Sequence, residues 1–537
     1  MRQKIYCLLA CCVVALCVFA KPARRGAMKL TQPDGTQITA YLHGDAFFHY
    51  YTTADGQMLE RNADGFYHPT TMPSQNELQA RHMSNTRRVA MQQKVGTLNL
   101  APRGLVILVN FSDLTFQTSY EEMENMLNGQ NYSRSYTYKD EGRTRWISSS
   151  GSARQYFQDN SCGQYNPVFD VIGPVTVSRG YAYYGQNDSQ GDDKRPDQMI
   201  KEACELVNDE VDFSLYDNDG DGQVDFVYVI YAGYGEADGA GENYIWPHNY
   251  RLTYTGVNCI VDGKRVDNYA CSNELDYYSK QHDGIGTFCH EFSHVLGLPD
   301  LYATTENATH KTMGAWDILD YGPYNNDGNT PPAYSAYERF YMGWLQPTLI
   351  NSACDVELPA LGATNSAVLM TRTGEHNMNG ANPNPKEFYL LENRQKDGWD
   401  QYLPGHGLLV TKINYDESKW SNNKVNASQY VMGVDIVEAD GKKTAYSQSN
   451  RENGYFGKPG DTYPTGADSF TELTSYPVTN IREENGKICF QVSGGGENIN
   501  LDVKDTKQNT SAGKVVRDGK ILIEHKGKYY DLLGNIQ

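Results

Sequence analysis

One short stretch of the chain contains residues that could bind a metal ion and activate water. His290, Glu291 and His294 form the pattern HExxH, and Gly297 and Asp300 follow it. In a helix, His290 and His294 lie one turn apart on the same face, so both imidazoles can bind one cation. Glu291 is rotated by about 100° from His290, which places its carboxylate beside the metal. The spacing therefore predicts a metal site with a glutamate next to it.

The residues that follow predict a third ligand. Gly297 can adopt the left-handed conformation that ends a helix, and Pro299 prevents the helix from restarting. Asp300 is then placed to turn back towards the metal. Two neutral imidazoles, one carboxylate and a position left for water are the ligand set of a catalytic zinc.

The element that carries these residues is predicted to be a buried helix. Apolar residues surround the motif on nearly all sides, namely Ile285, Phe288, Cys289, Phe292, Val295 and Leu296. Buried histidines beside a buried glutamate need partners. This pattern argues against a surface helix with two ordinary histidines.

Three segments carry a family resemblance. HEFSHVLGLPDLY, MGAWDILDYG and PPAYSAYERFYMGWL closely resemble the immune inhibitor A-like metallopeptidases, family M6. The resemblance implies a zincin domain in which His290, His294 and Asp300 bind zinc, Glu291 is the catalytic base, and a Met-turn lies beneath the metal. Leu319 stands where the family usually has Met, and its similar volume can preserve that hydrophobic base.

Other residues are candidates to complete the site. Trp246 and His248 lie in a glycine-rich loop that could form the rim over the cleft, where both could face substrate, although a structural role is the alternative for His248. Tyr321 and Tyr324 could donate hydrogen bonds to a tetrahedral intermediate. Glu338 is the alternative third ligand, because thermolysin-like zincins use a glutamate on a downstream helix.

An acidic stretch, YDNDGDGQVD, predicts a calcium loop. Oxygen ligands at alternate positions curl around calcium, and Gly222 permits the sharp turn that this requires. Tyr228 replaces the terminal glutamate of an EF-hand, so we expect a structural, calcium-loop-like site, with a solvated acidic turn as the alternative. The family resemblance favours calcium. The candidate ligands are Asp217, Asp219, Asp221, Gln223 and Asp225.

The amino terminus predicts export. Arg2 and Lys4 precede an apolar run that ends at Ala20, so residues 1–20 are expected to be a signal peptide cut before Lys21. Its removal would take the formal charge from −19 to −21, which argues against nucleic acid and anionic membranes as partners. No later stretch is long and apolar enough to span a membrane. We therefore expect a secreted or cell-surface protein.

Seven cysteines lie beyond residue 20, an odd number that leaves at least one unpaired within an oxidised chain. Cys259 and Cys271 bracket a hairpin-like segment and could form a bridge. Cys354 and Cys489 are a second candidate pair. Cys289, on the apolar helix, is the expected free thiol.

The predicted fold class is α+β. Residues 101–350 are expected to form the catalytic domain, a twisted mixed sheet plus the active-site helix. Residues 21–100 read as a small β-rich pro-region with turns at three Asp-Gly pairs, and residues 351–493 as a β-sandwich-like domain. Residues 494–537 form a linker and a short tail that resembles the end of type IX secretion sorting domains, which makes the secretion machinery a possible partner.

The pro-region implies latency. No cysteine occurs between residues 21 and 161, so a pro-region thiolate cannot close the site, whereas a blocking carboxylate or steric cover could. The polar, basic segment from Gln79 to Gln93 is the expected cleavable connector.

These features together predict a secreted zinc metalloendopeptidase made as a zymogen, acting on proteins or peptides. One rival is an inactive zincin-fold adhesin or binding protein. The other is a metal-dependent esterase or glycan hydrolase, which the ligand set alone does not exclude.

Overall fold

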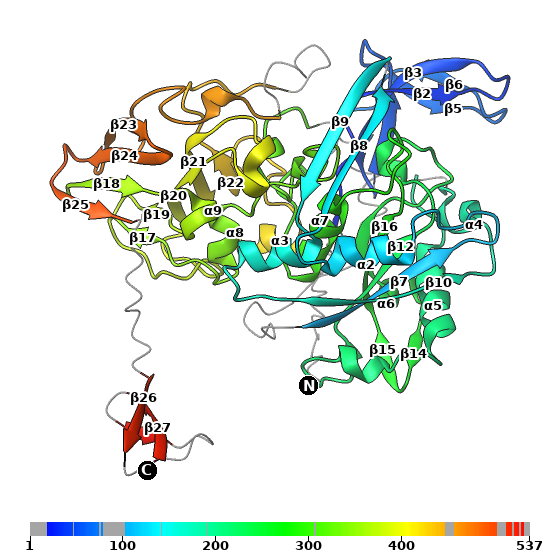
Figure 1. The fold of residues 1–537 in the computed structure, drawn as a ribbon. Coiled ribbons are helices and arrows are strands. Elements are labelled where there is room, and N and C mark those ends of the chain that lie inside the picture. The colour runs from blue at the N-terminus through cyan, green and yellow to red at the C-terminus, as the bar shows by residue number, and fades with distance from the viewer. Residues whose placement is uncertain are drawn as a thin grey trace, which may run out of the picture.

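The computed structural model describes most of the chain, in segments. They are residues 19–46, 48–74, 77–78, 102–140, 142–188, 191–305, 308–445, 456–501, 512–517, 520–525 and 528–530. Most of the predicted signal peptide and the whole connector from Gln79 to Gln93 lie outside these residues. The predicted mixed α+β fold is confirmed, with several sheets and the helices between them (Figure 1).

A six-stranded mixed sheet forms the framework of the catalytic region. Its order is β1 (Phe19–Ala20), β13 (His248–Arg251), β16 (Asn268–Asn273), β12 (Val227–Tyr231), β7 (Arg103–Asn110) and β10 (Val168–Thr176). The last four strands are parallel, whereas β13 runs antiparallel to β16. Strands β7 and β12 are continuous apolar runs, and β12 is buried at every residue. The antiparallel edge strand β13 pairs in turn with β1, from the start of the described chain.

Helices cover both faces of this sheet. On one face lie α2 (Tyr120–Asn128), α3 (Ala153–Asn160) and α7 (Ile285–Val295), and on the other lies α5 (Pro196–Val207). Ser119 caps α2 by accepting a hydrogen bond from the backbone N–H of Glu122, as its spacing predicts. The short helices are α4 (Tyr181–Gly185), α6 (Leu252–Thr255), α8 (Ala336–Tyr341), α9 (Leu361–Thr364) and α10 (Glu417–Ser421).

Helix α7 is buried along its whole length, as predicted. It lies near the centre of the molecule, between the six-stranded sheet and the later β-rich part (Figure 1). A methyl group on Gly284 would stand 2.0 Å from the carbonyl oxygen of Gly328, so only glycine lets that loop approach the start of the helix. Gly297 adopts φ +92°, the left-handed conformation predicted for the end of the helix.

The amino-terminal part forms an antiparallel sheet of five strands. They are β2 (Ala27–Thr31), β3 (Gln37–Asp45), β4 (Phe48–Thr52), β5 (Met58–Arg61) and β6 (Tyr67–Thr70), paired in chain order. The three predicted Asp-Gly turns join successive strands, with Gly35, Gly56 and Gly65 each at φ +85°. The hairpin-rich reading of this region is confirmed.

Two sheets beyond residue 347 share one apolar core. The first contains β17 (Thr348–Leu349), β19 (Val368–Met370), β20 (Glu387–Arg394), β21 (Gly407–Asn414) and β22 (Val434–Ile436), and the second β23 (Val478–Glu484), β24 (Lys487–Val492), β18 (Cys354–Leu358) and β25 (Glu497–Asn500). Smaller sheets join β8 (Ser133–Asp140) to β9 (Arg143–Ser150), and β11 (Gln223–Val224) to β15 (Lys264–Val266) and β14 (Cys259–Val261). The tail contains the strands β26 (Ala512–Arg517), β27 (Lys520–His525) and β28 (Lys528–Tyr530).

The cysteines do not pair as the sequence suggested. All seven beyond residue 20 are free thiols, and Cys289 is buried as expected. Cys271 contacts the His248 ring instead of Cys259, whose neighbour is the Cys204 thiol. Cys354 lies opposite Val492 in the sheet, and Cys489 lies opposite Glu357. In the described part of the chain no helix has the length and apolar character needed to cross a membrane.

Candidate active site

His290 and His294 leave the same face of α7 and converge. Their Nε2 atoms are 3.1 Å apart, and both rings are completely buried. His290 Nδ1 donates to the carbonyl of Ile318 at 2.7 Å, and His294 Nδ1 donates to the carbonyl of Leu298 at 2.8 Å. Because a carbonyl can only accept, each neutral ring presents the Nε2 lone pair to the other ring. Two lone pairs at this separation call for a cation between them.

Asp300 completes the cluster. Its Oδ1 lies 3.4 Å from His290 Nε2 and 3.2 Å from His294 Nε2. Asp300 is also completely buried, so its carboxylate needs a positively charged partner at this cluster. The side chain is held by Asn423, whose Nδ2 donates to Oδ2 at 2.6 Å while its Oδ1 accepts from the Asp300 backbone N–H at 2.8 Å.

Glu291 lies beside this cluster, as the helical spacing predicts. It is fully buried, and burial raises the pKa of its carboxyl to about 8. Glu291 Oε1 accepts a hydrogen bond of 2.9 Å from the backbone N–H of Lys21, far away in sequence. Glu291 Oε2 and Asp300 Oδ1 accept no hydrogen bond of good geometry from the described residues.

These atoms fit a zinc ion. Ligands bonded at about 2.0–2.1 Å to a tetrahedral zinc lie roughly 3.3 Å apart, close to the 3.1–3.4 Å that separates the two Nε2 atoms and Asp300 Oδ1. Two imidazole nitrogens and one carboxylate oxygen form a set that zinc prefers and that leaves a fourth position open. The backbone carbonyls on both Nδ1 atoms and the Asn423 amide on Asp300 orient the ligands from behind.

Comparison with known proteins agrees with this geometry. Residues 91–346 match the family model described as immune inhibitor A peptidase M6, catalytic domain. This segment of the chain is an M6-type catalytic domain. The chain is similar to the pre-pro-metalloprotease PrtV of Vibrio cholerae serotype O1, at 27% identity over 217 residues, which cover 36% of this chain and 23% of PrtV. Immune inhibitor A of Bacillus thuringiensis subsp. alesti is 24% identical over 409 residues, 67% of this chain and 58% of that protein. The matches thus span about a quarter of one relative and somewhat over half of the other.

The cleft of the M6 domain contains an extended segment of the same chain. Ala20 pairs with His248 on the edge strand β13, and the backbone continues past Glu291. Three successive carbonyls of this segment, those of residues 20, 21 and 22, accept hydrogen bonds from side chains. The donors are Tyr302 Oη at 2.7 Å, Trp246 Nε1 at 2.9 Å and Tyr324 Oη at 2.6 Å.

Tyrosines surround the site, and the sequence singled out only some of them. Tyr302, two residues after Asp300, was missed, although its hydroxyl faces the Ala20 carbonyl next to Glu291. Tyr321 and Tyr324 both line the cleft, but their hydroxyls bind Arg25 Nε and the Pro22 carbonyl. The position of Tyr302, two residues after the candidate ligand Asp300, could have indicated from the sequence that it lies near the site.

The structure does not bring His248 to the cluster. Its ring lies against Tyr269 and Cys271, which belong to the core on the α5 side of the sheet, whereas α7 lies on the other side. His248 Nδ1 donates to the Trp246 carbonyl at 2.7 Å, and the Tyr269 hydroxyl is 3.0 Å from Nε2. These contacts are those of a structural histidine.

Glu338 is not a neighbour of the histidines either. It lies at the start of α8, where it forms a capping box with Ser335 and contacts Asp317. Burial and the Asp317 charge raise the pKa of its carboxyl well above the ordinary value. Of the two candidate third ligands, the structure places Asp300 at the cluster and Glu338 away from it.

The acidic loop brings together part of the predicted calcium set. Carboxylate oxygens of Asp217, Asp219 and Asp225 gather within 4.8 Å of one another. Asp221 does not belong to this group of carboxylates, and it accepts hydrogen bonds from the backbone and side-chain amides of Gln223. Lys264 Nζ lies 2.6 Å from Asp217 Oδ2 and supplies positive charge at the loop.

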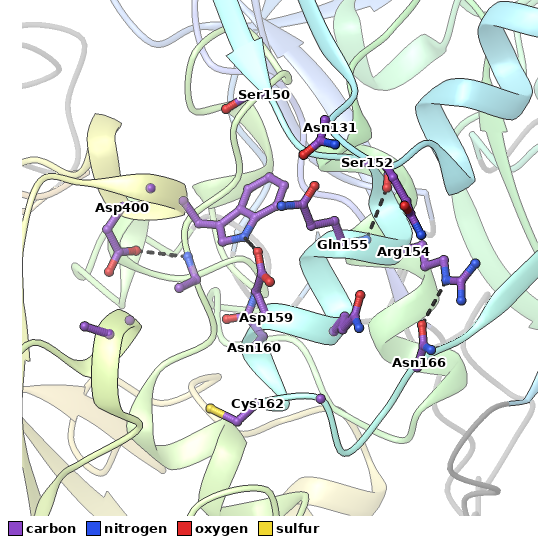
Figure 2. Close-up of a pocket in the computed structure, with 18 of the residues that line it drawn as sticks. Asn131, Ser150, Ser152, Arg154, Gln155, Asp159, Asn160, Cys162, Asn166 and Asp400 are labelled. Carbon is purple, nitrogen blue, oxygen red and sulfur yellow. Dashed lines mark hydrogen bonds between the residues drawn. The ribbon is translucent and has the colours of Figure 1, made fainter. Parts of the chain in front are cut away.

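A second hollow lies beside α3, away from the histidine cluster. It has a volume of about 930 Å³ and a largely polar lining that includes Arg154, Asp159 and Trp399. Figure 2 shows Arg154 reaching Asn166, and the Trp399 indole donates to Asp159 Oδ2 at 3.0 Å. None of the four residues of the HExxH and Asp300 cluster lines it.

Proposed function

We propose that this chain is an exported zinc-dependent endopeptidase that is made in a latent form. The observation that carries the proposal is the convergence of His290 Nε2, His294 Nε2 and Asp300 Oδ1, with the Glu291 carboxylate beside them. We assign the metal to the first three residues and general base catalysis to Glu291. We also propose that residues 101–350 form a zincin-type catalytic domain.

Bound zinc would act as a Lewis acid that polarises a carbonyl and acidifies water. Glu291 accepts the proton of the attacking water and delivers it to the leaving amine, because its Oε1 faces the backbone nitrogen of the peptide in the cleft. The Tyr302 hydroxyl donates to the adjacent carbonyl oxygen and is placed to stabilise its negative charge.

The intramolecular segment favours peptides as substrates over esters or glycans. It adds a strand to the β13 edge and receives three hydrogen bonds on its backbone carbonyls. Recognition of an extended backbone by an exposed strand edge is a general way to bind peptides.

The same segment supports latency. The Lys21 backbone N–H occupies Glu291 Oε1, and the amino-terminal sheet that follows this segment packs against Ala237 and Trp246. In this arrangement a backbone amide, not a carboxylate, faces Glu291. If the chain is cut before Lys21, as its sequence suggests, that nitrogen becomes an ammonium group opposite Glu291 and the contact becomes an ion pair. The pro-region is assigned to residues 21–100.

Two further assignments go with the proposal. Asp217, Asp219 and Asp225 are assigned a structural calcium ion, which a rise in melting temperature on adding calcium to dialysed protein would test. Residues 351–493 are assigned a β-sandwich-like domain, and residues 494–537 a linker and sorting tail.

Replacement of Glu291 distinguishes the proposed peptidase from the alternative, an inactive binding protein. Glu291→Gln is expected to retain one zinc per chain and to reduce casein cleavage by roughly 100-fold or more. Zinc content by mass spectrometry and cleavage by the processed protein are the two measurements. Full cleavage by the variant would refute the assignment of Glu291, and a wild-type protein that binds zinc but cuts nothing would favour the binding protein.

A further inference from the structure

The side chain of Lys21 is buried in the cleft and enters a pocket of opposite charge. Only 1% of the residue is exposed. Its Nζ lies 3.2 Å from Asp238 Oδ1 and 3.0 Å from Thr287 Oγ1, and it stands 4.8 Å from the centre of the Tyr324 ring. Thr287 in turn donates to Asp283 Oδ2 at 2.8 Å. The pocket therefore offers a carboxylate, a hydroxyl and an aromatic face to one ammonium group.

Asp238 is balanced by cations of the amino-terminal segment, through an ion pair with Lys21 and the nearby charge of Arg24. It is 2% exposed, its Oδ1 binds Lys21, and its Oδ2 accepts no hydrogen bond from the described residues. A buried carboxylate that loses its cation is strongly destabilised. When the amino-terminal segment leaves the cleft, the pocket keeps its charge and needs another cation. A basic side chain of a substrate can supply it.

The backbone defines which residue of a substrate would reach this pocket. The Lys21 nitrogen is 2.9 Å from Glu291, the group assigned to protonate the leaving amine. The preceding carbonyl, of Ala20, accepts from Tyr302. Lys21 thus occupies the place of the residue that follows the cleaved bond.

From these contacts we propose that Asp238, Thr287 and Tyr324 form a specificity subsite, and that the enzyme cleaves polypeptides on the amino side of lysine. The inference rests on the proposed peptidase function and names its substrate class. In this hydrolysis, water adds across the bond: the new carboxylate belongs to the preceding residue, and the lysine becomes the amino terminus of the second product.

The test uses the full chain, loaded with zinc and activated by limited proteolysis. Matched fluorogenic peptides carry lysine, norleucine, leucine or glutamate at one position, and mass spectrometry identifies the bond cut. The expected kcat/KM for lysine exceeds that for norleucine, which has the same four side-chain carbons without the ammonium group, by about 100-fold.

Variants then assign the selectivity to the pocket. Asp238→Asn should reduce the lysine-to-norleucine ratio by roughly 100-fold, and Thr287→Val by about tenfold. Asp209→Asn, an exposed carboxylate at the end of α5, should leave the ratio unchanged. Thermal unfolding identifies any variant that fails to fold, and the Thr287 variant still tests the pocket if the Asp238 variant does not fold.

A second measurement uses the unprocessed chain. Lys21→Met should weaken the binding of the amino-terminal segment in the cleft and therefore raise basal peptide cleavage. Lys29→Met, at an exposed site on β2, should leave basal cleavage unchanged. Zinc-dependent cleavage with no preference for lysine would overturn the inference and leave the peptidase function standing. A zinc-loaded, activated protein that cuts no peptide would overturn both.

Discussion

The candidate site depends on single side chains that hold others in place. Asn423 forms two hydrogen bonds with Asp300, one to the carboxylate and one from the backbone N–H. It lies more than a hundred residues after the ligand, in the β-rich part of the chain. Asn423, which orients the Asp300 carboxylate so that Oδ1 faces the histidines, therefore lies outside the segment that matches the M6 model.

Asn423→Ala is expected to weaken zinc binding by about 10–100-fold, because a ligand that loses its supporting hydrogen bond can rotate away from the metal. Competition with a fluorescent zinc chelator measures this. Asn422→Ala, which removes an amide bonded only within α10, is the control. Equal zinc affinity in the two variants would show that Asn423 does not position the ligand.

Strand β13 has two functions at the scale of secondary structure. Its edge pairs with residues 19–20, and its His248 side chain anchors the strand to the core on the α5 side. Burial lowers the pKa of His248 to about 4. The neutral ring donates through Nδ1 to the Trp246 carbonyl and accepts at Nε2 from the Tyr269 hydroxyl. Protonation would remove the acceptor.

Strand β13 is therefore expected to be sensitive to acid. The pKa of His248 is lower in the folded than in the unfolded chain, so the unfolded chain takes up a proton first as the pH falls. The stabilisation is present above about pH 6.5 and decreases by about 3 kcal/mol as the pH falls to about 4. Denaturant unfolding across this range should be less pH-dependent in His248→Gln than in the wild type. The same pH dependence of the unfolding free energy in the variant and the wild type would contradict this role of His248.

At the scale of the whole molecule, buried polar contacts connect the active-site loop to the carboxyl-terminal sheets. Asp461 accepts from Lys311 Nζ at 2.6 Å and from Trp316 Nε1 at 3.0 Å, and neither Lys311 nor Asp461 is exposed. Trp316 begins the loop that provides the Ile318 carbonyl to His290. The later β-rich part thus stabilises the metal site.

Asp461→Ala is expected to destabilise the protein by about 3 kcal/mol, because it removes the closer of the two carboxylates, Asp461 and Glu438, that pair with the buried Lys311. It should also weaken zinc binding through the displaced loop. Thermal unfolding and zinc content measure the two effects, with Asp468→Ala, an exposed carboxylate, as the control. A loss of stability with unchanged zinc content would show that the contacts of Asp461 do not support the candidate metal site.

The sequence by itself determined the features that depend on local spacing. The i, i+4 histidines, the glycine that ends α7, the Asp-Gly hairpins and the two apolar central strands follow from periodicity and turn chemistry, which act within a few residues. These features were enough to predict the helix and its four candidate residues.

Contacts between distant segments were decided only by the tertiary structure. Three hydrogen bonds join segments that are far apart along the chain: Lys21 to Glu291, Tyr302 to Ala20, and Asn423 to Asp300. The tertiary structure likewise places Glu338 in the cap of α8, away from the histidines. No periodic pattern encodes such pairs, because they result from how the sheets and helices pack. For the same reason the proposed cysteine bridges were wrong and His248 faced the opposite side of the sheet.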